Sequence, residues 1–174
     1  MNENASRGLD RYVGMPICWL LTLWRRMLAF FVKERHFELE EPRKVLFIKL
    51  SEMGAIVLAM PALEAARQRF GKKNLYGLML AGNREIHDLL DAIPHDNLIA
   101  IRDQSLWTFA VDVVHALRRC RRERIDTVID WEGFARISAI LSYLTGARRR
   151  VGLHRFTNEG LDRGDLYTHR VAVN

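Results

Sequence analysis

Two short segments of the sequence combine polar side chains with glycine in a way that could support chemistry. The first, residues 51–55, contains a serine, a glutamate and a glycine that would let a ligand approach the backbone closely. The second, residues 130–136, holds two carboxylates separated by one residue and an arginine at its end. A carboxylate can take a proton from a hydroxyl group, and a guanidinium can hold an anion. Together the segments predict a site for an anionic ligand that carries a hydroxyl group.

Each segment also has a plainer interpretation, which the sequence leaves open. Gly54 can simply turn the chain. Asp130 can cap the next helix while the charges that follow it stay solvated. The first segment contains neither GxGxxG nor GxxxxGK followed by serine or threonine, which disfavours dinucleotide binding of the dehydrogenase kind and P-loop chemistry.

A parallel α/β sheet would bring the two segments together. Short apolar runs that alternate with amphipathic ones predict strands separated by helices, joined by right-handed crossovers. The expected strands are 44–50, 74–80, 97–101, 127–130 and 149–153. The expected helices are 56–70, 83–90 with Asn83 as its cap, 105–122 and 135–145. Both segments follow a strand, so we expect both at the carboxyl edge of the sheet, where open α/β domains bind ligands. Beyond residue 153 the chain is polar and rich in turns, and no further element is predicted there.

The composition is that of an ordinary globular domain with a basic surface. The chain has 174 residues, 49% hydrophobic and 28% charged, with a net charge of +6. Such a charge favours anionic partners, although an ordinary basic surface without a specific partner is equally compatible with it. Arginines crowd residues 118–124 and 148–150, where a solvated helix end is favoured over a nucleic-acid patch because interleaved aromatic residues are missing. We therefore expect no nucleic acid among the partners.

The cysteines and histidines do not form a metal-binding pattern. Cys18 and Cys120 lie far apart without a CxxC motif, and the six histidines are scattered. The sequence therefore predicts neither a metal site nor a disulfide framework, and a reducing compartment fits best.

The segment 1–41 precedes the predicted domain, which spans 42–174. Its uncharged run, residues 13–24, has about half the length needed to span a bilayer and is not a good secretory signal. With Pro16 in the first turn, the run predicts an amphipathic helix. Tryptophans and neighbouring arginines suit a membrane interface with anionic lipid. The alternative is a helix packed on the domain or on a partner domain.

Over residues 44–70 and 125–152 the chain resembles glycosyltransferase family nine, the heptosyltransferases of lipopolysaccharide core assembly. The matching features are the apolar strand ending in Ile-Lys-Leu, the following Ser-x-Met-Gly, the Ile-Asp-x-Val-Ile-Asp of the later strand, and Arg-Arg-Val-Gly near residue 152. The resemblance implies a GT-B fold, in which two Rossmann-like domains face a cleft. It further implies that the amino-terminal domain binds an anionic glycolipid acceptor and that a carboxyl-terminal domain, absent from this chain, binds a nucleotide-sugar donor resembling ADP-heptose. Transfer would invert the anomeric centre and need no cofactor and no metal.

Two positions depart from the pattern of the family. Ala55 stands where the family usually carries the aspartate that deprotonates the acceptor, and Arg136 stands where a lysine is common. The resemblance then leaves Glu52 and Glu132 as candidate substitute bases. The residues expected to contact the acceptor are Ser51, Gly54, Gly133 and Arg136.

Two functions are carried forward from these observations. The first is a heptosyltransferase-like enzyme, here as its acceptor-binding half, cytoplasmic or peripheral on the cytoplasmic face of an inner membrane. The second is a non-catalytic, membrane-associated binding module derived from such an enzyme. A basic nucleic-acid binder ranks last, because nothing beyond charge supports it.

Overall fold

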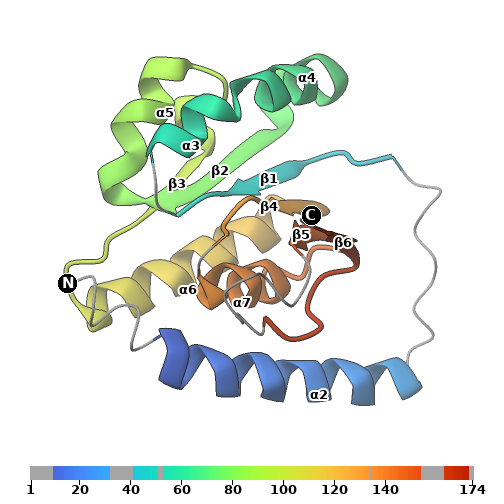
Figure 1. The fold of residues 1–174 in the computed structure, drawn as a ribbon. Helices are drawn as coiled ribbons and strands as arrows, with labels where there is room; N and C mark the ends of the chain where they lie inside the picture. Colours follow the sequence, from blue (N-terminus) through green and yellow to red (C-terminus); the bar gives the residue numbers. More distant parts are fainter. Residues whose placement is uncertain (1–9, 32–40, 51–52, 134, 154–162, 173–174) are drawn as a thin grey trace.

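The computed structural model describes residues 10–31, 41–50, 53–133, 135–153 and 163–172. Within them, six parallel strands form one sheet in the order β3-β2-β1-β4-β5-β6 (Figure 1). The strands are β1 (Val45–Ile48), β2 (Leu75–Leu80), β3 (Leu98–Ile101), β4 (Thr127–Asp130), β5 (Arg149–Leu153) and β6 (His169–Val171). The α-helices are α2 (Met15–Phe31), α3 (Met53–Leu58), α4 (Met60–Phe70), α5 (Arg84–Leu90), α6 (Leu106–Arg122) and α7 (Arg136–Leu144). Short π or 3-10 turns are η1 (Asp10–Gly14), η3 (Lys72–Asn74), η4 (Ala81–Asn83) and η5 (His95–Asn97).

The register of the sheet places β1 at its centre. Ile48 is level with Leu78 of β2 on one side and with Asp130 of β4 on the other. Strand order runs outward from β1 toward β3 in one direction and from β4 toward β6 in the other, which is the doubly wound arrangement of a Rossmann-like sheet. The predicted α/β fold with a parallel sheet and a preceding amino-terminal helix is therefore confirmed.

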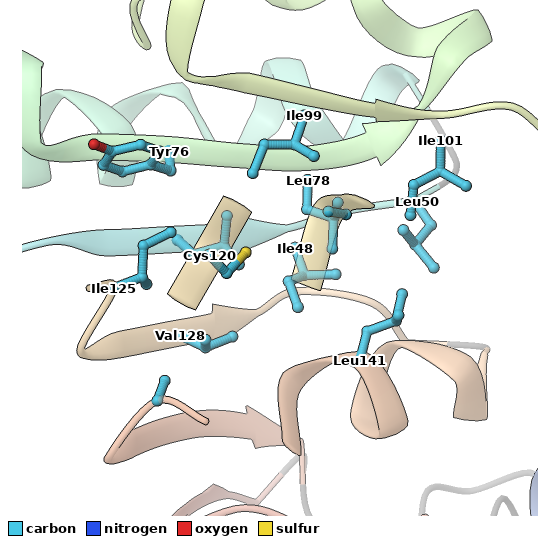
Figure 2. Close-up of a cluster of buried hydrophobic side chains, with 13 residues drawn as sticks. Ile48, Leu50, Tyr76, Leu78, Ile99, Ile101, Cys120, Ile125, Val128 and Leu141 are labelled. Carbon is cyan, nitrogen blue, oxygen red and sulfur yellow. The ribbon is translucent and has the colours of Figure 1, made fainter. Parts of the chain in front are cut away.

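Alternate residues of the buried strands supply two hydrophobic clusters, one on each face of the sheet. Leu46 and Ile48 point into the cluster beneath α6 and α7, which Figure 2 shows in close-up. Val45 and Phe47 point into the opposite cluster, which contains Leu63 of α4. In Figure 1, α3, α4 and α5 lie on one side of the sheet, and α6 and α7 lie on the other. Because both faces are covered, the strands β1, β2 and β3 are almost entirely apolar, as is typical of parallel sheets.

Several helix boundaries follow from local chemistry. Ser105 caps α6 in a capping box with Thr108, which fixes the start of that helix. The single helix predicted over 56–70 is two helices, because Pro61 stands in the first turn of α4, where its missing N–H does no harm. Asn83 precedes α5, but its side chain makes no capping bond and instead donates to the Leu50 carbonyl oxygen at 2.8 Å.

The sixth strand was not predicted. Strand β6 pairs with β5 in parallel, and all three of its residues are exposed, so it has no apolar run to reveal it. The approach to β6 is nevertheless well buried: Leu166 and Tyr167 pack against Ile140 of α7. Gly152 of β5 makes room for this packing, since an added Cβ would lie 2.8 Å from Cδ1 of Tyr167.

Helix α2 forms an outer layer beyond α7. It packs through Cys18 and Leu21 on a cluster that includes Ala139 of α7 and Tyr167 (Figure 1). Its length is 17 residues, and none of the helices in the described ranges is long and apolar enough to cross a membrane.

Candidate functional site

The candidate site lies where β1 and β4 end side by side. The order of strands reverses between these two, and open α/β sheets bind ligands outside the carboxyl ends of strands at such a point. The Trp131 N–H continues the pairing beyond β4 by donating to the Ile48 carbonyl oxygen at 3.0 Å. The Trp131 ring also packs on Phe47, with centroids 4.6 Å apart. The loop after β4 is thus fixed directly against the end of β1.

A buried ion pair connects the two strand ends. Lys49, just past β1, places Nζ 3.5 Å from Oε2 of Glu132, and their side chains are 6% and 0% exposed. Desolvated charges of this kind persist because each compensates the other, and removing one partner is strongly destabilising. Glu132 therefore holds the site together and does not face solvent.

Asp130 is the second buried carboxylate of this loop. Its Oδ1 accepts a bond from the Glu132 N–H at 2.8 Å, and its Oδ2 accepts one from the Tyr167 hydroxyl at 2.6 Å. Burial raises the pKa of Asp130 to about 6, although the bond from Tyr167 opposes the shift. Burial also raises the pKa of Tyr167. The alternative in which Asp130 caps the next helix and Glu132 is solvated is wrong, because Ala135 is the N-cap of α7 and both carboxylates are buried.

A buried arginine, Arg163, contacts the loop that carries Glu132. The side chain of Arg163 is fully buried, and its Nη1 donates to the Glu132 carbonyl oxygen at 2.6 Å. Within the described part of the chain, its Nε and Nη2 have no hydrogen-bond partner. Its positive charge lowers the pKa of Asp130 and so offsets part of the effect of burial.

Arg136 is held by the amino-terminal segment. Its Nη1 lies 3.1 Å from Oδ2 of Asp10, and the two side chains are 7% and 15% exposed. Oδ1 of Asp10 also accepts bonds from the backbone N–H groups of Arg136 and Ile137, at 2.9 and 3.1 Å. Asp10 thereby satisfies free donors at the start of α7 and adds a negative charge where the helix dipole favours one.

The glycines of the two segments leave open space. Gly54 is exposed and lies in α3, and an added Cβ at Gly54 or at Gly133 would meet no atom of the described residues within 4 Å. Since Gly54 does not adopt the left-handed backbone that favours glycine, the interpretation as a simple turn has no support in the structure. Ala55 is half-buried in the same helix. Ser51 and Glu52 lie outside the described residues.

Sequence reasoning missed four residues of this site: Asp10, Lys49, Arg163 and Tyr167. Lys49 left a signal, because a lysine at the end of an otherwise apolar strand requires a partner when buried. Nothing in the sequence indicated that Asp10 pairs with Arg136, because 126 residues separate the two.

Other polar features of the described chain serve the fold. Arg121 donates to the Leu144 carbonyl oxygen at 2.9 Å, and the buried Arg150 donates to that of Leu166 at 2.8 Å. Both cysteines are buried. A search of the described residues finds no cluster of histidine, cysteine and carboxylate side chains suited to a metal ion. A shallow cavity of about 290 Å³ lies at the edge strand β3, with Arg84 and Arg119 in its wall.

No protein-family model matches the sequence, and no curated protein matches it either. The fold, however, is similar to solved structures. Escherichia coli heptosyltransferase WaaC, in complexes with ADP-2-deoxy-2-fluoro heptose and with ADP, matches 75% of this chain with a TM-score of 0.60 and 21% identity. A glycosyl transferase of family 9 from Veillonella parvula DSM 2008 matches 67% of the chain with a TM-score of 0.53 and 18% identity. The chain spans 42% and 33% of the lengths of these two proteins. The match in fold agrees with the resemblance to glycosyltransferase family nine that the sequence indicates.

Proposed function

We propose that this chain is the acceptor-binding half of an inverting glycosyltransferase of the heptosyltransferase kind. One observation carries the proposal: β1 and β4 lie adjacent at the reversal of strand order, with a charged cluster at their carboxyl ends. The similarity in fold to WaaC, a heptosyltransferase solved with ADP and an ADP-heptose analogue, supports a nucleotide-sugar donor for the complete enzyme. The acceptor is an anionic glycan of the lipopolysaccharide-core type.

In this proposal the acceptor lies along the loops that follow β1 and β4. Gly54 and Gly133 present backbone without side chains, so a sugar ring can approach closely. Ser51 supplies a hydroxyl, and Arg136, whose guanidinium is paired with Asp10, shapes the start of α7 beside the acceptor. The positive net charge of the chain attracts such an acceptor over longer distances.

The reaction requires a carboxylate to accept one proton. The acceptor oxygen forms a bond to the anomeric carbon of the donor sugar, and the bond from that carbon to the diphosphate breaks. The hydroxyl proton passes to the carboxylate, and the nucleoside diphosphate leaves with the electron pair. Glu132 is committed to Lys49 and has no exposed surface, so the proposal assigns the proton to Glu52.

The test is transfer from ADP-heptose to a lipopolysaccharide-core glycolipid by the protein that contains this chain. Glu52→Gln should lower kcat by roughly two to four orders of magnitude with little effect on unfolding. Glu85→Gln, on the exposed face of α5, is the matched control and should retain full activity. Full activity of Glu52→Gln would remove Glu52 as the base, and absence of transfer from any sugar nucleotide would remove the enzymatic proposal.

A second function, a non-catalytic binding module, rests on Ala55. An alanine cannot accept a proton at the position where the family usually carries its base, and Glu132 is buried. This function predicts saturable binding of the anionic glycan with no transfer in the wild-type protein. Binding and transfer measured on the same preparation distinguish the two functions.

A further inference from the structure

Helix α2 faces the domain with a mixed polar and apolar side and turns most of its large apolar residues outward. The side of the helix that faces the domain carries Cys18, Thr22 and Arg25, spaced four and three residues apart. Cys18 is buried, and Thr22 Oγ1 accepts a bond from the Asp165 N–H at 2.9 Å. Arg25 donates to the Asp165 carbonyl oxygen. These polar contacts act together with the apolar packing of Cys18 and Leu21 to hold the helix in place.

The attachment is close as well as polar. Gly164, with a φ of +64°, lies directly beneath α2, and an added Cβ would lie 2.8 Å from the Cys18 carbonyl oxygen. The same Cβ would overlap Oγ1 of Thr22. Only glycine allows the backbone at position 164 to come this close to α2. The close packing at Gly164 therefore fixes the orientation of α2.

The outward side of α2 carries the large apolar residues. Trp19 and Leu20 are 66% and 65% exposed, and Trp24 is 58% exposed. Leu23 and Met27 are half exposed on the same helix. Together these side chains present on the order of 500 Å² of apolar surface, which is at the upper end for a single patch on a soluble monomer. A surface helix of a soluble domain normally points such residues inward, so this face requires a partner.

The residue types on the outward face of α2 favour a lipid surface as the partner. Two tryptophans among leucines match the depth of the headgroup region, where an amphipathic indole has both apolar and polar neighbours. Arg26, whose side chain is 65% exposed, stands three residues after Leu23 at the margin of the face, with Nη2 3.9 Å from Oδ2 of Asp165. The chain as a whole carries 27 basic against 21 acidic residues, which complements anionic headgroups.

We propose that the outward face of α2 docks the domain in the plane of an anionic lipid bilayer. The helix lies in the interface and does not span it. This inference goes beyond the proposed function and does not depend on it, because it rests on the exposed side chains of α2 alone. Docking would also bring Asp10, and with it the start of α7, close to the membrane surface, since η1 leads directly into α2.

The experiment is co-sedimentation of the full chain with vesicles. Wild-type protein should sediment with vesicles of phosphatidylcholine and phosphatidylglycerol, less with phosphatidylcholine alone, and less at high salt. The double variant Trp19→Gln/Trp24→Gln should lower the partition coefficient by roughly tenfold or more, because two interfacial indoles are lost. Trp107→Gln, at a tryptophan of α6 that is 78% exposed, is the control and should bind as the wild type does.

Three measurements keep the outcome decisive. Circular dichroism should show unchanged folding in all variants, because each replaced tryptophan is exposed. Acyl-brominated phosphatidylglycerol should quench the tryptophan fluorescence of the wild type and of Trp107→Gln, and quench the double variant less. Equal vesicle binding by the double variant and the wild type would overturn the proposal. So would a wild-type dimer, seen by sedimentation velocity, that the double variant converts to a monomer without any change in lipid binding.

Discussion

Asp10 and Arg136 form an ion pair between the amino-terminal segment and the candidate site, with 3.1 Å between Oδ2 and Nη1. The same carboxylate accepts the first backbone N–H bonds of α7. The segment before the sheet is therefore part of the wall of the site. A further contact agrees with this, since an added Cβ at Gly14 would lie 3.2 Å from Cβ of Arg136.

The contact of Asp10 with Arg136 should contribute measurably to the free energy of unfolding. Asp10→Ala removes both a cap and a largely buried ion-pair partner, so the free energy of unfolding should fall by about 2 kcal/mol. Asp10→Asn keeps an oxygen that can accept the N–H bonds and should lose about half as much. Urea denaturation measures both, with Asp103→Ala in the loop before α6 as the control. Equal losses at positions 10 and 103 would contradict a specific role for Asp10.

The Lys49–Glu132 pair predicts strong non-additivity. Lys49→Met leaves a buried carboxylate without its ion-pair partner and should lower the free energy of unfolding by about 3 kcal/mol. Lys49→Met combined with Glu132→Gln should lose clearly less than the sum of the single changes, since no uncompensated charge remains. The exposed pair of Glu64 and Arg67 is the comparison, and its coupling should be much weaker because solvent screens both charges. Additive losses at Lys49 and Glu132 would show that the pair is not coupled.

Asp130 predicts a pH dependence of stability with a defined sign. Its pKa is about 6 when folded and near 3.8 otherwise, so the folded state binds more protons between these values. Its stabilising contribution is therefore complete below about pH 4 and is lost as the pH rises through 6. The difference in unfolding free energy between wild type and Asp130→Asn should fall by roughly 3 kcal/mol across this range.

Asp112 provides a control of opposite sign for that experiment. Hydrogen bonds from Arg102 hold the pKa of Asp112 well below its usual range. Its contribution is present above about pH 4 and is lost as the pH falls below that value. The difference between wild type and Asp112→Asn should thus be flat from about pH 5 upward. A flat profile for Asp130→Asn over the same range would contradict the assignment of its raised pKa.

Substitutions at Gly146 and Gly164, which both have a positive φ, distinguish the cost of backbone strain from the cost of disturbing the packing of α2. Gly146→Ala adds a Cβ in open space, so it should lose only about 1 kcal/mol of stability from the left-handed backbone. Gly164→Ala adds the same strain and an overlap with α2, and should lose about 1–3 kcal/mol more. Hydrogen exchange of the amides of α2 should accelerate in Gly164→Ala alone. Equal exchange in the two variants would mean that α2 is not packed on Gly164.

The central strands of the sheet were predictable because they are buried on both faces. Apolar runs such as Val45–Ile48 stand out between glycine turns and helical patterns, and β4 and β5 occupy the predicted residues. Strand β6 offers no such pattern, since His169–Val171 is polar at its start and exposed throughout. Its position depends on the burial of Leu166 and Tyr167 beside it, which only the folded chain brings together.

The candidate site was predictable in place but not in its internal contacts. The loops after β1 and β4 had to meet, because parallel strands end at one edge. Which charges pair could not be read from residue types, and Glu132 proved to be buried against Lys49. The sequence left the orientation of α2 open, because its tryptophans suited a membrane interface and packing on the domain was the alternative.

The most direct test of the account is a nuclear magnetic resonance titration of the chain with an anionic core glycan. The account predicts saturable changes in amide shifts concentrated in residues 49–55 and 131–137, on both sides of the β1–β4 boundary. Changes centred on the cavity at β3, near Arg84 and Arg119, or no saturable change at all, would contradict it.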